Sequence, residues 1–144
     1  MSDVPQRVTV MLVDDEENIL HSLQRLLMDE DYDIVTATSG EAGLEKLKTL
    51  ENVGLIVSDL RMPVMDGAEF LKRSRELFPD AQRVYLTGLS DVKAALAALT
   101  AGGARRYLSK PWDDNALITA IREQVELYRQ GGAKKKLQEV CNQD

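Results

Sequence analysis

Polar residues that can do chemistry stand directly after four short apolar runs, where strands of a sheet would end. They are Asp14, Asp15, Asp59, Thr87 and Lys110. Because the carboxyl ends of parallel strands meet at one edge of a sheet, we expect these side chains to lie close together. Three carboxylates at close range raise one another's pKa unless a positive charge compensates. The pattern therefore predicts a cation site beside a lysine and a hydroxyl group.

The predicted site suits phosphoryl chemistry. Its candidate ligands are all oxygen atoms, which favours Mg²⁺, or Mn²⁺ in its place, over zinc or copper. A carboxylate can attack phosphorus to form an aspartyl phosphate, and such transfer depends mainly on positioning and charge neutralisation. Asp59 is the best nucleophile candidate because it stands alone at its strand end, across from Asp14 and Asp15. Lys110 and the metal would neutralise the transferred oxygens, and Thr87 would donate a hydrogen bond to one of them.

Two kinds of segment alternate along the chain and indicate the fold that must position these residues. Five expected strands alternate with five helical patterns, and this alternation predicts an α/β fold, a doubly wound five-stranded parallel sheet covered on both faces. Apolar, β-branched runs predict the strands, at 7–13, 32–37, 54–58, 82–86 and 105–109. Apolar residues at spacings of three and four predict the helices, at about 19–27, 40–47, 67–77, 90–101 and 113–129.

Local signals mark where several helices begin and end. Ser39 precedes the second helix, and Asp66, with Glu69 three residues on, resembles a capping box before the third. Gly131 and Gly132 are predicted to break the last helix. We therefore expect one domain over 1–130, with its core at about 7–129, and a tail or linker over 131–144.

Composition excludes several other classes of protein. With 144 residues and a net charge of −6, the chain fits one acidic domain without the basic footprint of a nucleic-acid-binding protein. One cysteine and one histidine exclude an internal disulfide, a cysteine zinc site and a multi-histidine metal site. Because the sequence shows neither a membrane-length apolar run nor a signal peptide, we expect a cytoplasmic protein without a membrane partner.

At these motifs the chain resembles the receiver domain of a two-component response regulator, the fold typified by the chemotaxis regulator. The resemblance covers about 7–129, implies the flavodoxin-like strand order 2-1-3-4-5, and rests on five pieces that occur in order at the expected strand ends. They are Val13-Asp14-Asp15-Glu16, Ser58-Asp59-Leu60-Arg61-Met62-Pro63, Met65-Asp66-Gly67, Leu86-Thr87-Gly88 and Ser109-Lys110-Pro111.

The resemblance assigns roles to the acidic residues. It implies that Asp59 accepts a phosphoryl group from the phosphohistidine of a histidine kinase. It also implies that Asp15 binds Mg²⁺ directly, that Asp14 helps through water, and that the backbone carbonyl of Arg61 completes the coordination by the protein.

The resemblance also implies a switch. Lys110 would contact the phosphate, and its bond to Pro111 would be cis. Thr87 would move toward the phosphate, and Tyr107 would rotate inward when Thr87 moves. Phosphorylation would thereby bias an existing equilibrium between two conformations.

The output of the switch is left open by the sequence. The run Lys110-Pro111-Trp112-Asp113-Asp114 is similar to receivers joined to HD-GYP phosphodiesterase domains, although this chain has no HD or GYP motif. The tail is therefore interpreted as leading to a missing output domain or simply ending, with a downstream protein as the other possible partner. A homodimer is also compatible with the resemblance.

Two other functions compete with the phosphorylation switch. A phosphatase of the haloacid dehalogenase type also combines Asp, Thr and Lys, but it requires Asp-x-Asp after the first strand, whereas Asp14 and Asp15 are adjacent. A pseudo-receiver would be an interaction module without phosphorylation, and it would have lost an acid, the phosphoacceptor or the lysine.

Several other residues have a simpler interpretation than a role in chemistry. His21 lies in the first predicted helix and is expected to have a structural or surface role. Asp66 is a helix cap rather than a metal ligand, Cys141 a free thiol in the tail, and Trp112 a packing residue at the start of the last helix. For Tyr107 the alternative to the switch role is half-buried packing on a strand.

Overall fold

The computed structural model describes residues 7–88, 93–94, 96 and 106–142. Its five-stranded sheet is parallel throughout, in the order β2-β1-β3-β4-β5, as the resemblance implied. The order reverses at β1, which lies between β2 and β3, so β1 and β3 flank the switch point where open sheets bind ligands. The strands are β1 (Thr9–Val13), β2 (Asp33–Ala37), β3 (Val53–Ser58), β4 (Gln82–Gly88) and β5 (Arg106–Lys110).

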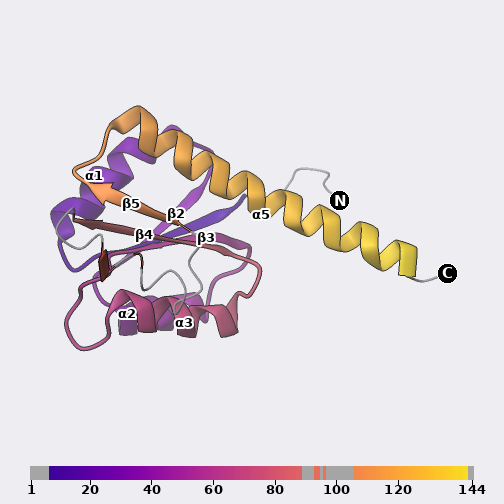
Figure 1. Ribbon diagram of the computed structural model, residues 1–144, viewed down its shortest axis with the longest axis horizontal. Coiled ribbons are helices and arrows are strands. Elements are labelled where there is room, and N and C mark those ends of the chain that lie inside the picture. Colours follow the sequence, from indigo (N-terminus) through magenta and orange to yellow (C-terminus); the bar gives the residue numbers. More distant parts are fainter. Residues whose placement is uncertain (1–6, 89–92, 95, 97–105, 143–144) are drawn as a thin grey trace.

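Helices cover both faces of the sheet. Figure 1 shows α1 and α5 on one face and α2 and α3 on the other. Their bounds are α1 (Glu17–Leu27), α2 (Gly40–Leu47), α3 (Gly67–Leu77) and α5 (Asp114–Asn142). The helix expected at 90–101 lies largely outside the described residues.

The core consists of two apolar clusters, one on each face of the sheet. Met11 and Ile56 belong to the cluster under α2 and α3, whereas Leu12 and Leu55 belong to the cluster under α1 and α5. Because alternate residues of a strand point to opposite faces, both sets must be apolar when both faces are covered. This explains why β1 and β3 are uninterrupted apolar runs that end only where polar residues reach the edge of the sheet.

The predicted helix caps are confirmed. Ser39 accepts a hydrogen bond from the Ala42 backbone N–H at 3.1 Å, and Asp66 accepts one from the Glu69 N–H at 2.9 Å. Each cap satisfies an N–H group that has no partner within its helix. The Asp66 cap fixes the start of α3 directly after the loop that follows β3.

The predicted break in the last helix is wrong. α5 continues through Gly131 and Gly132 to Asn142, and Figure 1 shows its C-terminal part extending beyond the sheet. Glycine lowers helix stability by about 1 kcal/mol relative to alanine, but it remains compatible with helical backbone angles. Beyond its own helix, no atom of the described residues lies within 4 Å of a Cβ built on Gly131, so packing there does not require glycine.

Two side-chain contacts fix the first half of α5 on the domain. Arg122 forms a bidentate ion pair with Glu30, at 2.8 and 2.7 Å, and the Tyr128 hydroxyl donates to Asn52 Oδ1 at 2.7 Å. Both contacts hold the helix over the sheet before it leaves the domain. Among the described residues, no helix combines the length and the apolar character needed to span a bilayer.

Candidate phosphoryl-acceptor site

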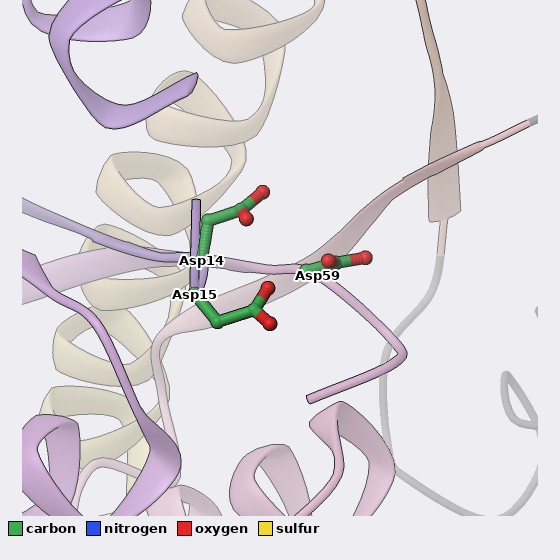
Figure 2. Close-up of side chains that lie close together, drawn as sticks. All are labelled: Asp14, Asp15 and Asp59. Carbon is green, nitrogen blue, oxygen red and sulfur yellow. The ribbon is translucent and has the colours of Figure 1, made fainter. Parts of the chain in front are cut away.

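The sheet brings the three predicted acidic residues together. The Asp59 N–H donates to the Val13 carbonyl oxygen at 2.9 Å, so the chain after β3 stays paired with the end of β1. One carboxylate oxygen from each of Asp14, Asp15 and Asp59 lies within 4.8 Å of the others. Figure 2 shows the three side chains extending to the same side of the strand ends. The predicted convergence of these acids is therefore confirmed.

Lys110 joins the cluster from the end of β5. Its Nζ lies 2.6 Å from Asp14 Oδ2 and 3.4 Å from Asp59 Oδ2. Its side chain is 16% exposed, and those of Asp14 and Asp59 are 3% and 11% exposed, so water screens these charges weakly. The bond from Lys110 to Pro111 is cis, as expected.

The buried charges perturb the titration of Asp59 and Lys110. Burial and the negative charge of Asp14 raise the pKa of Asp59, against the opposing effect of Lys110. Burial favours a lower pKa for Lys110, but the hydrogen bond and charges of the two carboxylates outweigh it and raise that pKa. With three carboxylates and one ammonium group, the ionised cluster carries a net charge of −2, which matches a divalent cation.

Asp14 is fixed by a contact that sequence reasoning missed. Its Oδ1 accepts a hydrogen bond from the Glu16 N–H at 2.9 Å, while Oδ2 faces Lys110. Both oxygens already have protein partners, which favours a metal contact through water over direct ligation. An aspartate that accepts from the backbone two residues later forms an Asx turn. The Asp-Asp-Glu run before a helix is a local signal by which this turn could have been found.

Thr87 and Tyr107 lie on the same face of the sheet. Tyr85 lies two residues before Thr87 on β4, so the two side chains point to the same face of the sheet. Tyr107 on β5 pairs in register with Tyr85, as Ser109 does with Thr87, and therefore lies on that face as well. The Thr87 side chain is fully buried, and its hydroxyl has no hydrogen-bond partner among the described residues. Tyr107 is half-buried against the core cluster under α2 and α3. A buried hydroxyl without a partner is rare, and within the described part of the chain Thr87 keeps a donor available near the end of β4, on the strand next to the one that ends at Lys110.

The loop between β3 and α3 closes tightly on Asp59. The Gly67 N–H donates to the Leu60 carbonyl oxygen at 2.8 Å. A Cβ on Gly67 would lie 2.0 Å from the Asp59 carbonyl oxygen, so any other residue would displace the backbone of Asp59. This close approach explains the glycine in the Met65-Asp66-Gly67 motif. Arg61 lies exposed in the same loop.

The donor set fits Mg²⁺. Opposite ligands of an octahedral Mg²⁺ are about 4.2 Å apart, since each bond is about 2.1 Å long. A cluster whose oxygens lie within 4.8 Å of one another therefore has nearly the right size, with some ligands bound through water. The oxygen-only chemistry and the charge of −2 agree with this cation.

Other residues singled out from the sequence lie outside the cluster. His21 is exposed on α1, and Asp66 serves as a helix cap, both as expected. Trp112 packs against the core cluster under α1 and α5, and its Nε1–H donates to Asp114 at 3.1 Å.

Comparisons with known proteins agree with this geometry. Residues 10–122 match the model of the response regulator receiver domain. The chain is 38% identical over 121 residues to the hydrogenase transcriptional regulatory protein HoxA of Bradyrhizobium diazoefficiens, and 36% identical over 118 residues to FixJ of Rhizobium meliloti. These matches cover 84% and 82% of this chain, but only 24% and 57% of the relatives. The chain thus spans less than two thirds of either regulator.

A solved structure supports the same assignment. The signal receiver domain of an HD domain-containing protein from Pseudomonas fluorescens Pf-5 superposes with a TM-score of 0.83 and 36% identity, over 92% of this chain and 97% of that one. The fold and acidic site define a class of phospho-accepting signalling switches rather than classical enzymes. The chain belongs to the response regulator receiver domain family of two-component systems. Receiver domains of this family bind Mg²⁺ at an acidic pocket and work with histidine kinases and output domains.

Proposed function

We propose that this chain accepts a phosphoryl group on Asp59 in a reaction that needs Mg²⁺. The observation that carries the proposal is the buried Asp59 carboxylate within 4.8 Å of two further acids and 3.4 Å from Lys110. A phosphohistidine of a histidine kinase would donate the group. The P–N bond breaks as a P–O bond to Asp59 forms, and the imidazole nitrogen keeps the electron pair and takes up a proton.

The chain's own residues share the work of the transfer. Asp15 would hold Mg²⁺ directly, with Asp14 acting through water and the Arg61 carbonyl as a further ligand. Bound Mg²⁺, or Mn²⁺ in its place, would supply charge neutralisation and orientation of the phosphoryl oxygens. Lys110 lies within ion-pair distance of Asp59 and would neutralise a further oxygen.

Thr87 and Tyr107 would carry the signal away from the site. The Thr87 hydroxyl, which has no partner among the described residues, would donate a hydrogen bond to a phosphoryl oxygen, and Tyr107, on the same face, would follow it inward. The receiver domain would occupy 1–130, and the C-terminal part of α5 would lead to an output domain or a downstream protein. The Pseudomonas receiver comes from an HD domain-containing protein, which supports an output domain of the HD class, such as an HD-GYP phosphodiesterase. Self-association into a homodimer is compatible with this proposal.

Labelling with a small phosphodonor tests the proposal. The protein is incubated with Mg²⁺ and acetyl phosphate, and its intact mass is measured. We expect the gain of one phosphoryl group that alkali removes, and no gain in Asp59→Asn or in EDTA. Asp66→Asn is the matched control, because it changes the next acid along the chain and retains a residue that can cap α3. Equal labelling of Asp59→Asn would refute the acceptor assignment, and no labelling of the wild type would favour a pseudo-receiver.

A further inference from the structure

The loop between Asp59 and α3 presents one apolar side chain almost entirely to solvent. Val64 is 96% exposed, whereas Met62 and Met65 on either side of it are only 8% exposed. The two methionines of the loop therefore turn into the core, whereas Val64, next to exposed Pro63, turns out. Packing within this domain does not account for a valine at this position.

Backbone conformation does not account for the valine either. Val64 has φ of 69°, a left-handed conformation in which a β-branched residue is a marked outlier. The Met65 N–H donates to the Pro63 carbonyl oxygen at 2.8 Å, so the three residues form a γ-turn of the rare, strained kind. Glycine would adopt the same turn without a steric cost. The chain thus keeps an exposed apolar side chain where its own folding favours its removal.

Val64 lies close to the acceptor. The loop is closed at its base, where Gly67 bonds to Leu60 beside Asp59. Val64 is three residues from Gly67, so their Cα atoms are at most about 11 Å apart. A protein that delivers a phosphoryl group to Asp59 covers about 800 Å² of this surface in an interface of standard size, a disc of roughly 16 Å radius. Such a donor must cover the tip of the loop as well.

We infer that Val64 is a specificity-determining contact for the protein phosphodonor, and this inference rests on the proposed function. Its side chain inserts into an apolar patch beside the phosphohistidine of the donor. Backbone strain that the surrounding structure maintains is a recurrent feature of binding sites. Small donors such as acetyl phosphate have no surface for Val64 to contact, so the residue acts on recognition and not on the transfer itself.

The experiment compares a protein donor with a small donor. Purified histidine kinases are autophosphorylated with radiolabelled ATP, and the kinase that phosphorylates the wild-type chain fastest is the probe. Val64→Gly removes both the side chain and the strain, whereas Val64→Asn tolerates positive φ but is polar. Val64→Ile keeps the apolar contact, and Leu127→Ala is the control for loss of an exposed apolar side chain on α5, where Leu127 is 46% exposed.

We expect Val64→Gly and Val64→Asn to lower kcat/KM with the kinase by about tenfold, equivalent to about 1.4 kcal/mol. Val64→Ile and Leu127→Ala should retain the wild-type value, acetyl phosphate should label all variants at the wild-type rate, and Val64→Gly should unfold at a higher urea concentration. Wild-type kinetics of Val64→Gly with the kinase would overturn the inference, as would an equal loss with both donors. A lower rate of Val64→Gly with the kinase that arises only from weaker self-association of the chain would also overturn the inference. Absence of labelling of the wild type by acetyl phosphate would instead refute the proposed function.

Discussion

The Asp59 carboxylate is predicted to destabilise the metal-free fold, and Asp59→Asn tests this. Asp14 lies within 4.8 Å of Asp59, and at an effective dielectric constant of about 20 its repulsion is about 3.5 kcal/mol. The attraction between Asp59 and Lys110, whose Nζ lies 3.4 Å away, is about 5 kcal/mol on the same scale. The charge terms nearly cancel, because exposed Asp15 adds a further, weaker repulsion. The desolvation of a buried carboxylate then decides the sign and leaves a cost of about 1–2 kcal/mol.

The raised pKa of Asp59 also indicates that the ionised carboxylate destabilises the fold. The folded protein binds this proton more tightly than the unfolded chain, so stability falls as pH rises from the unfolded pKa through the folded one. Above the folded pKa the full cost is present. Asp59→Asn should therefore be more stable than the wild type by about 1–2 kcal/mol in EDTA at pH 7, roughly 4 °C in Tm per kcal/mol. The difference should shrink as pH falls below the folded pKa.

Urea unfolding followed by circular dichroism measures the effect. Asp31→Asn is the matched control, since it removes one exposed carboxylate outside the cluster and should leave the midpoint unchanged. With Mg²⁺ at ten times its Kd, the wild type should gain about 1.4 kcal/mol and Asp59→Asn much less. Lower stability of Asp59→Asn than of the wild type in EDTA would refute the electrostatic reasoning.

Four further outcomes are expected. Because ionised Asp59 is the proposed nucleophile and its pKa is raised, labelling by acetyl phosphate at low Mg²⁺ should fall as pH is lowered. The midpoint should move to lower pH at saturating Mg²⁺, and an unmoved midpoint contradicts this. Lys110→Met leaves two buried acids unpaired, so it should unfold about 3 kcal/mol more easily in EDTA and lose labelling. Gly67→Ala places a Cβ 2.0 Å from the Asp59 carbonyl oxygen and should cost about 3 kcal/mol and abolish labelling. Gly131→Ala, whose Cβ would meet no described atom beyond its own helix, should stabilise the protein by about 0.5–1 kcal/mol in urea unfolding.

Sequence by itself determined the sheet and the candidate acids. The strands are apolar runs because both faces of the sheet are covered, and each run ends at a polar residue because the edge is solvated. Strand ends were therefore readable within one or two residues, and the convergence of Asp14 and Asp59 followed from parallel topology. The break predicted at Gly131 is wrong because glycine only weakens a helix. Helix propensity, which is a local property, also takes no account of the tertiary contacts of Arg122 and Tyr128 that hold α5 on the domain.

Tertiary structure decided how the acidic site is arranged. Only the fold shows that Asp14 is held by both Lys110 and the Glu16 N–H, and that the Thr87 hydroxyl is buried without a partner among the described residues. The exposed, left-handed Val64 also has no signature in the sequence, where it is one more apolar residue in a loop. Spacing along the chain specifies which residues reach the sheet edge, whereas burial and distance between distant residues set their charge and hydrogen bonding, and these exist only in the folded molecule.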